Sequence, residues 1–256
     1  MYQIKPGHFS AGQEFSEFVA GQAACNIDSQ LPISFEDIPP SLKGKIREHL
    51  HASQCGRCAY CERPIKVEAS KIEHFHPQSL SNFEFYSSTC GARTNASGTS
   101  WRKVNVSLNN LLLCCEGTLS KGREFTCDTR KANSHICDVF YNPKSVSASV
   151  GSLVRIERSG EGVVIHFPST QSQAQGVYDD ILGLNDKALK GVRGDFYVEL
   201  MVSFTNKFHR LAANAPKQSG ARGSLKRKLL GALESNLAAQ SFPSVRLSVV
   251  NEIKSR

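Results

Sequence analysis

The spacing of apolar side chains predicts two helices in the last third of the chain. Between residues 185 and 213 apolar residues recur every three or four positions, at Leu189, Val192, Phe196, Leu200, Phe204, Phe208 and Leu211. This spacing places them on one face of an amphipathic helix. A second stripe predicts a helix over residues 225–239, and it consists of Leu225, Leu229, Leu233 and Leu237. Two glycines, Gly191 and Gly194, lower the helical propensity where the first helix begins.

Shorter patterns upstream predict strands and one short helix. Residues 152–168 contain two β-branched runs around a Ser-Gly-Glu-Gly segment, which predicts a β-hairpin. Residues 71–75 predict a short strand that Pro77 ends, since proline cannot donate to a sheet ladder. Residues 110–115 form a buried apolar stretch, and residues 128–133 open a helix.

These elements predict an α+β fold in three parts. An N-terminal helical lead spans residues 1–50, a central region spans 51–140, and a hairpin with basic helices spans 141–256. In the lead, two prolines precede an apolar stripe and predict a helix that Ser41 would cap. The stripe consists of Leu42, Ile46 and Leu50.

Length and composition favour a folded chain without a membrane span. The chain has 256 residues, of which 40% are hydrophobic, and this suffices for one or two cores. No run of 18 or more apolar residues occurs, so we expect no contact with a membrane. A signal peptide has a basic segment followed by an apolar one, and the first ten residues show no such pattern. We therefore expect a cytoplasmic protein.

The positive charge is concentrated at one end of the sequence. The formal net charge is +8, and residues 207–256 alone hold ten basic and two acidic side chains. The remaining residues hold equal numbers of basic and acidic side chains. A local excess of this kind suits a polyanion such as nucleic acid, or an acidic protein surface. The alternative is a solvated basic helix with no partner.

The cysteines indicate a metal site. Seven of the nine cysteines lie from Cys55 to Cys127, and three of these, Cys55, Cys58 and Cys61, form two overlapping Cys-x-x-Cys units. Without a secretion signal, such clustering favours metal binding over disulfides. Cys127 and one of the adjacent pair at 114 and 115 would complete a tetrahedral structural zinc site. A redox pair or simply buried thiols are the alternatives, although the redox motif belongs in a βαβ context that this region lacks.

A Glu-His pair lies between the two groups of cysteines. Glu73 offers a hard oxygen ligand for a divalent cation, and a neutral His74 can take a proton from water. Adjacent residues on a regular strand face opposite ways, so both reach one phosphate only if the strand ends or twists there. Pro77 makes such an end plausible. His76 would contact a phosphate, bind a metal or pack as an ordinary ring.

Four motifs together resemble an HNH endonuclease. They are CAYCE (58–62), IEHFHPQS (72–79), NNLLLCC (109–115) and CDTRK (127–131). More narrowly, they resemble the PtuB-like family, which is the HNH component of Septu-type and retron-linked anti-phage systems. The resemblance covers roughly residues 40–195, and its most specific part is the four core motifs.

The resemblance implies a ββα-metal core that a structural zinc ion stabilises and that binds one catalytic cation. It implies that His74 is the general base, that Asn110 braces the loop, and that Lys131 contacts a phosphate oxygen. Asp128 stands where most HNH enzymes have Asn or His. The implied metal ligands are Glu73 and Asp128 for Mg²⁺ (or Mn²⁺ or Ni²⁺), and Cys58, Cys61, Cys115 and Cys127 for structural Zn²⁺. Cys55 and Cys114 are then spare thiols or alternates.

The resulting hypothesis is a metal-dependent HNH endonuclease that hydrolyses nucleic acid, with DNA as the expected substrate and RNA as the alternative. The resemblance implies an anti-phage effector that works with a partner ATPase of the PtuA type. A competing hypothesis is a non-catalytic zinc module that binds nucleic acid or protein. It keeps the cysteines and makes Glu73, His74 and Asp128 incidental. A third hypothesis is a thiol redox protein.

Overall fold

The computed structural model describes residues 4, 7–25, 32–79, 81, 84, 100–117, 125–140, 142–144, 155–214, 220–235 and 242–255. The helices in these stretches are α1 (Gly12–Cys25), α2 (Pro40–Ser53), α5 (Cys127–Lys131), α6 (Ser172–Gly176), α7 (Lys187–Ala213), α8 (Ala221–Glu234) and α9 (Pro243–Ser255). The strands are β1 (Ser70–His74), β2 (Leu111–Cys115), β3 (Arg155–Ser159) and β4 (Gly162–His166). Short helical turns occur at Phe35–Asp37, Trp101–Val106, Ser169–Gln171 and Val177–Ile181.

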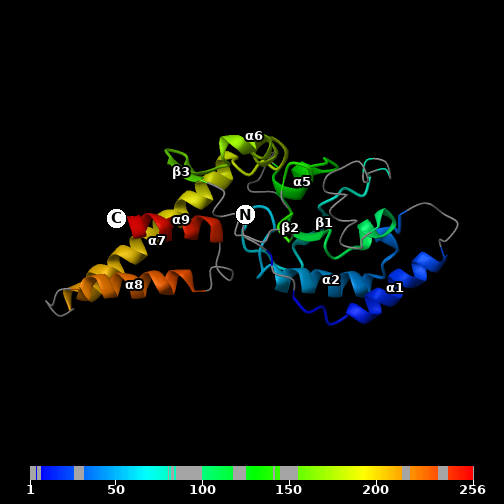
Figure 1. The fold of residues 1–256 in the computed structure, drawn as a ribbon, viewed down its shortest axis with the longest axis horizontal. Coiled ribbons are helices and arrows are strands. Elements are labelled where there is room, and N and C mark those ends of the chain that lie inside the picture. The colour runs from blue at the N-terminus through cyan, green and yellow to red at the C-terminus, as the bar shows by residue number, and fades with distance from the viewer. Residues whose placement is uncertain are drawn as a thin grey trace.

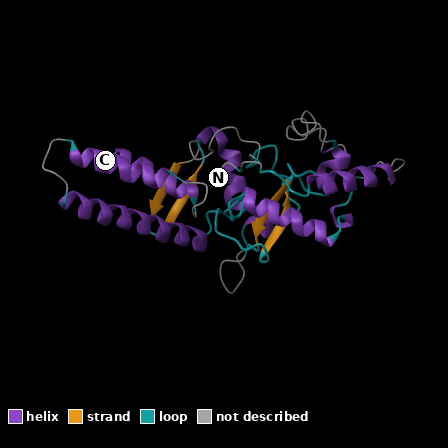
Figure 2. Cartoon of the chain, turned by 90° about the horizontal axis from the view of Figure 1, so that it is seen from below, coloured by secondary structure: helices purple, strands orange, loops and turns teal. Residues whose placement is uncertain are grey.

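The chain is an α+β structure, as predicted, and its shape is elongated. Figure 1 shows α1, α2, β1, β2 and α5 at one end and α7, α8 and α9 at the other. Each end contains one antiparallel strand pair beside helices, and Figure 2 shows the two pairs well apart. Among the described helices, none combines the length and the apolar character that crossing a bilayer requires.

The first strand pair joins β1 to β2, and its two faces contact different parts of the chain. Ser70 lies opposite Cys115 and His74 lies opposite Leu111, so the register is fixed over five residues. All five residues of β2 are buried. Because side chains alternate along a strand, Leu111 and Leu113 point to one face while Leu112 points to the other. The predicted strand at residues 71–75 and the predicted buried stretch at residues 110–115 are therefore both confirmed, and the structure pairs them.

Helix α2 covers the face of this sheet that carries Leu111 and Leu113. Its buried residues Leu42, Ile46 and Leu50 belong to the same core cluster as those two leucines. The helix begins at Pro40 with Pro39 as its N-cap, and no side chain caps it. The prediction that Ser41 caps this helix is wrong. Proline fixes φ near the helical value and lacks the N–H that a first turn would leave unpaired, so it starts the helix by itself.

The end of α2 is bonded to the middle of β2 through Gln54, which is buried. Its side-chain oxygen accepts from the Leu113 backbone N–H at 2.7 Å, and its amide nitrogen donates to the Leu113 carbonyl at 2.7 Å and the Arg57 carbonyl at 2.6 Å. The amide thus satisfies backbone groups at a buried sheet edge, which would otherwise carry a desolvation cost.

The second strand pair is the predicted hairpin, and it packs on α7. Gly194 on α7 faces Gly162 on β4 so closely that a Cβ at Gly194 would lie 2.8 Å from the Gly162 Cα. A glycine near the start of α7 lowers helix propensity, but here it lets the helix approach the hairpin. Helix α7 matches the predicted span to within two residues at its start. Helix α8 begins four residues before the predicted start and ends at Glu234, and residues 236–239 of the predicted helix lie outside the described part.

Helix α9 connects the helical end of the chain to the cysteine-rich region. Its buried residues Val245, Val249, Val250 and Ile253 share one core cluster with Cys58, Cys61 and residues of α7. Buried Glu62 accepts hydrogen bonds from the Ser244 backbone N–H at 3.0 Å and its hydroxyl at 2.6 Å. Burial favours the neutral acid, yet the pKa of Glu62 is lowered, and the two Ser244 bonds contribute. One apolar core therefore crosses the predicted boundary between residues 140 and 141.

The substitution Gln54→Ala tests the bond between α2 and β2. We expect it to lower the free energy of unfolding by about 1–3 kcal/mol, because the Leu113 N–H becomes buried without a partner. Urea denaturation monitored by circular dichroism measures the change. The matched control is Ser53→Ala, whose hydroxyl donates to the Leu50 carbonyl within the same helix at 3.1 Å. An equal loss in both variants would contradict the interpretation.

Candidate metal centre and active site

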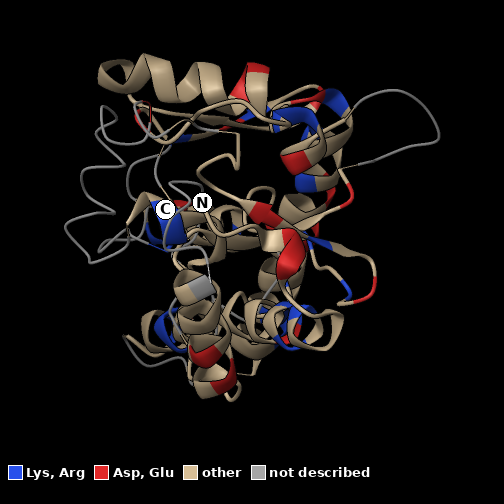
Figure 3. Ribbon diagram, turned by 90° about the vertical axis from the view of Figure 1, so that its right-hand side faces the viewer, with Lys and Arg blue, Asp and Glu red and all other residues tan. Residues whose placement is uncertain are grey.

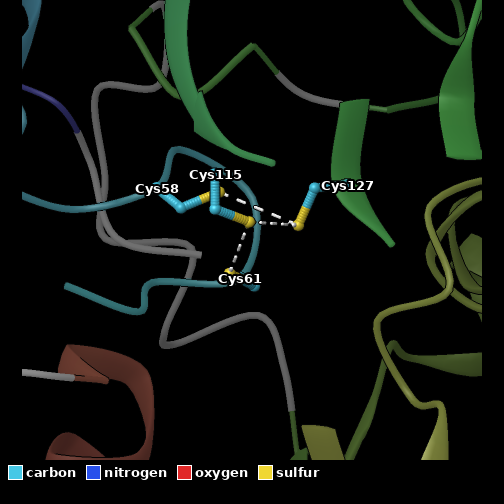
Figure 4. Close-up of side chains that lie close together, drawn as sticks. All are labelled: Cys58, Cys61, Cys115 and Cys127. Atoms are coloured by element: carbon cyan, nitrogen blue, oxygen red, sulfur yellow. Dashed lines mark hydrogen bonds between the residues drawn. The ribbon is translucent and has the colours of Figure 1, made fainter. Parts of the chain in front are cut away.

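Four cysteine thiols from three separate segments converge in the core. Cys58 and Cys61 lie on the turn after α2, Cys115 ends β2 and Cys127 begins α5. All four sulfur atoms lie within 4.8 Å of one another and all four residues are buried. Three of the separations are 3.7 Å (Cys58–Cys127), 3.8 Å (Cys61–Cys115) and 3.7 Å (Cys115–Cys127), drawn as dashed lines in Figure 4.

These separations match the geometry of tetrahedral zinc. Zinc–sulfur bonds of about 2.3 Å at tetrahedral angles place neighbouring sulfurs about 3.8 Å apart. Four thiolates would close the coordination sphere and leave no position for water or substrate, which is the pattern of a structural site. The cluster therefore fits a structural metal such as zinc, as the sequence predicted.

The turn that carries Cys58 and Cys61 is shaped by its own backbone. The Cys58 N–H donates to the Arg63 carbonyl at 2.9 Å, and the Glu62 N–H donates to the Cys58 carbonyl at 3.1 Å. Glu62 has a φ of 63° and Cys127 has a φ of 57°, both in the left-handed region. Non-glycine residues adopt this region at a cost, so its occurrence at Cys127 and directly after Cys61 indicates that surrounding contacts enforce the geometry.

The electrostatics of the cluster favour negative charge on one of its sulfurs. Hydrogen bonding with Cys127, Cys58 and Cys61 lowers the pKa of the Cys115 thiol. Burial raises the pKa of Cys58 and of Cys127. The Arg63 Nη2 lies 3.4 Å from the Cys115 sulfur, and the thiols at Cys115 and Cys61 raise the guanidinium pKa against the effect of burial. Arg63 would thus offset part of the charge of four thiolates.

The other thiols of this region lie outside the four-sulfur cluster. Cys55 is exposed. Cys114 is buried within hydrogen-bonding range of Cys58, and burial raises its pKa to about 12. The geometry thus selects Cys115 from the adjacent pair. Cys25 and Cys90 have side chains outside the described part of the chain.

Glu73 and Asp128 lie together although 55 positions separate them in the sequence. The Glu73 carboxylate is buried, and its Oε1 accepts from the Tyr60 hydroxyl at 3.1 Å and lies 2.7 Å from the Lys131 Nζ. Burial and a hydrogen bond with Asp128 raise the pKa of Glu73 to about 8, against the opposing effect of Lys131. Burial and Glu73 also raise the pKa of the Tyr60 phenol, which therefore stays a donor.

Lys131 faces inward, toward Glu73. Its side chain is 1% exposed, and its Nζ also donates to the His74 carbonyl at 3.1 Å. A contact with a phosphate, as the resemblance implies, would require the amine to leave this pair. In the structure Lys131 instead joins the last two residues of β1 to α5.

His74 is buried on the opposite face of β1 from Glu73. Its Nε2 lies 2.9 Å from the Asn105 carbonyl, and its ring packs against Phe35 with the centroids 4.9 Å apart. Burial lowers the pKa of His74 to about 4, with a further contribution from Lys131. A carbonyl can only accept a hydrogen bond, so Nε2 carries the proton and Nδ1 keeps the lone pair of the neutral ring. Asp128 and Lys131 are near enough to act on its charge.

Asn110 joins the end of β1 to the segment before β2. Its Oδ1 accepts from the His76 N–H at 2.7 Å, and its Nδ2 donates to the His76 carbonyl at 3.2 Å and the Val104 carbonyl at 3.1 Å. All the polar atoms of its side chain are used in this way, and the residue is buried. A bracing position of this kind is what the resemblance implies for Asn110.

Sequence reasoning missed several residues of this region. Tyr60 lies inside the motif CAYCE, but nothing in that motif shows that its hydroxyl reaches Glu73. Arg63 directly follows the cysteine turn, where a cation could have been expected to offset thiolate charge. Cys137 and His135 carry no motif at all, yet they lie beside His76. No protein-family model, curated protein or solved structure matches the chain.

Loss of one thiol tests the metal centre. We expect wild-type protein to keep one tightly bound zinc ion per chain after brief EDTA treatment, since a closed thiolate site exchanges slowly. Cys61→Ser should lose that ion and melt at a lower temperature. Elemental analysis and thermal denaturation measure the two effects. Cys55→Ser is the matched control, because its exposed thiol lies outside the cluster. Wild-type protein that contains no zinc would contradict the prediction.

Proposed function

We propose that the chain is a metal-dependent HNH-type endonuclease that hydrolyses phosphodiester bonds of nucleic acid, with DNA as its substrate. The observation that carries the proposal is the contact between Glu73 and Asp128. Their carboxylates meet because β1 pairs with β2 and α5 packs beside it, in the order strand, strand, helix that a ββα-metal core requires.

The charges around these carboxylates suit a divalent cation. Glu73 and Asp128 carry two acidic groups, and Lys131 provides one ammonium group close to them. Asp128 is only partly buried, so a cation from solvent can reach its carboxylate, while Glu73 is buried. Carboxylate oxygens are the ligands that Mg²⁺ and Mn²⁺ prefer. We assign Glu73 and Asp128 as the residues that would hold Mg²⁺ (or Mn²⁺ or Ni²⁺).

The remaining residues would position the phosphate and the water. When bound, the cation would supply stabilisation of the negative charge that develops on the phosphate and the leaving oxygen. His74 would accept the proton of the attacking water at Nδ1, with Asn105 fixing its ring through Nε2. Asn110 would hold the backbone at the end of β1, and Lys131 would hold Glu73 in place.

The basic helical end offers a surface for the nucleic-acid backbone. On α8, Arg222, Arg227 and Lys228 are exposed, and no ion pair within the described residues involves them. A hollow of about 410 Å³ between α8 and α9 is lined by Lys226, Arg227, Leu230, Glu234 and Lys254. Figure 3 shows basic and acidic positions interleaved along the ribbon.

The resemblance extends the proposal to a biological setting. We propose that the nuclease is the effector of an anti-phage defence system and works with a partner ATPase of the PtuA type. On α7, Val198 and Val202 are 49% and 52% exposed, which leaves apolar surface against which a protein partner can pack.

A second candidate function is a non-catalytic zinc module that binds nucleic acid or protein. The buried pair between Glu73 and Lys131 favours it, because an ion pair of this kind can serve structure alone. Under this alternative the four-thiol cluster keeps its role, while Glu73, His74 and Asp128 have no chemistry to perform.

Removal of the proposed base separates the two functions. We expect His74→Ala to lower the rate of Mg²⁺-dependent nicking of supercoiled plasmid by about 10²–10⁴-fold, since it removes general-base catalysis. Asp128→Asn should have a comparable effect by weakening the cation site. Gel quantification of nicked product gives the rates, and elemental analysis should show unchanged zinc.

The control for this experiment is His166→Ala, which removes a partly exposed imidazole from β4, outside the proposed site. Equal nicking rates for wild type and His74→Ala would reject the nuclease proposal. Absence of any divalent-dependent cleavage by the wild-type protein would favour the non-catalytic module.

Neutralising the exposed cations of α8 tests nucleic-acid binding. We expect the double variant Arg227→Gln and Lys228→Gln to bind duplex DNA more weakly at every sequence. The slope of log affinity against log salt should fall by about two, one for each lost phosphate contact. Fluorescence anisotropy across a salt series measures it. Lys45→Gln is the control, because that lysine already pairs with Glu14 at 2.5 Å. An unchanged slope would exclude α8 from the interface.

A further inference from the structure

We propose that His76, His135 and Cys137 form a second metal site that binds a transition-metal ion such as Zn²⁺. Their ligand atoms all lie within 4.8 Å of one another. The Cys137 sulfur is 3.0 Å from the His76 Nδ1. The ring centroids of His76 and His135 are 6.4 Å apart, at an interplanar angle of 31°. The four-thiol cluster uses none of these residues.

The three ligands come from two elements that are already held in place. His76 follows β1, and Asn110 binds both its backbone N–H and its carbonyl. His135 and Cys137 follow α5 and flank Ile136, which is completely buried. Because the backbone on both sides is anchored, the ligand set is organised before any ion binds, and the ordering cost of binding is small.

The chemistry of the ligands selects the class of ion. Two imidazole nitrogens and one thiolate suit Zn²⁺ and other late first-row metals, whereas Mg²⁺ and Ca²⁺ prefer oxygen ligands. The site is therefore chemically distinct from the carboxylate pair of Glu73 and Asp128. Binding forms one metal–sulfur and two metal–nitrogen bonds, and the proton of the Cys137 thiol is released to solvent.

The observed separation requires only a small adjustment. With bonds of about 2.3 Å to sulfur and 2.0–2.1 Å to nitrogen, the two atoms would lie about 3.6 Å apart. They are now 3.0 Å apart in a hydrogen bond, so they must separate by about half an ångström. His135 is exposed, and its ring can turn to meet an ion that arrives from solvent.

A thiol beside an imidazole is also the arrangement of a nucleophilic pair. Here Cys137 is 1% exposed and His76 is 2% exposed, so no substrate can reach the sulfur. Metal binding needs only that an ion can approach, and the exposed His135 is the ligand that an ion arriving from solvent would meet first. Three protein ligands leave one coordination position open, unlike the closed four-thiol cluster. The second ion should consequently exchange more readily with chelators than the first.

Metal titration of the full-length chain tests the proposal. Protein that has been treated briefly with EDTA is titrated with Zn²⁺, and native mass spectrometry counts the ions per chain. A parallel titration with Co²⁺ follows thiolate-to-cobalt absorption. We expect the wild-type protein to take up one further ion. In His135→Ala that ion should bind at least about tenfold more weakly, because loss even of an outer-sphere partner costs 10–100-fold.

Two further variants make the result decisive. His209→Ala removes an exposed histidine from α7 and should bind the second ion as wild type does. Cys137→Ser should lose the added cobalt absorption, and circular dichroism checks that it folds. Since His135 is exposed, its removal leaves the core intact and the proposal testable even if Cys137→Ser does not fold. No further ion in wild type, or wild-type affinity in His135→Ala, would overturn the proposal.

Discussion

The convergence of four thiols is the constraint on which the rest of the candidate site depends. Cys58 and Cys61 fix the turn that carries Tyr60 toward Glu73. Cys115 fixes the end of β2, and Cys127 fixes the start of α5. Because α5 begins at a ligand, its next turn brings Asp128 and Lys131 against the same face of β1. An ion bound by the four sulfurs would therefore determine both the fold of this region and the geometry of its acidic pair.

Much of the secondary structure could be predicted from local patterns, and the exceptions have physical causes. The hairpin and α7 have strong periodicity, and both were found within a few residues of their predicted spans. Helix α9 was not predicted. Its buried positions are occupied by Val245, Val249, Val250 and Ile253, whose β-branched side chains favour strands over helices. Packing against α7 and the cysteine region overrides that local preference.

The candidate site was predictable only where its spacing is local. A Cys-x-x-Cys turn places two thiols together by its own geometry, so the ligands Cys58 and Cys61 could be recognised without a structure. The choice of Cys115 over Cys114 depends on which face of β2 packs on that turn. The pairing of Lys131 with Glu73 depends on burial, which no motif encodes. The same holds for Cys137 and His76, whose contact spans 61 positions.

The hydrogen bonds between Glu62 and Ser244 close a segment of 182 residues. Closing so long a loop costs more chain entropy than pairing neighbouring elements, and contacts of this range slow folding. The β3–β4 hairpin and the α7–α9 helices need far shorter loops. Glu62 lies directly after the ligand Cys61, so these hydrogen bonds tie the cysteine turn to a helix near the far end of the sequence. A buried carboxylate without these partners would carry a desolvation cost, so the turn that holds two of the four thiols depends for its stability on residues 182 positions away.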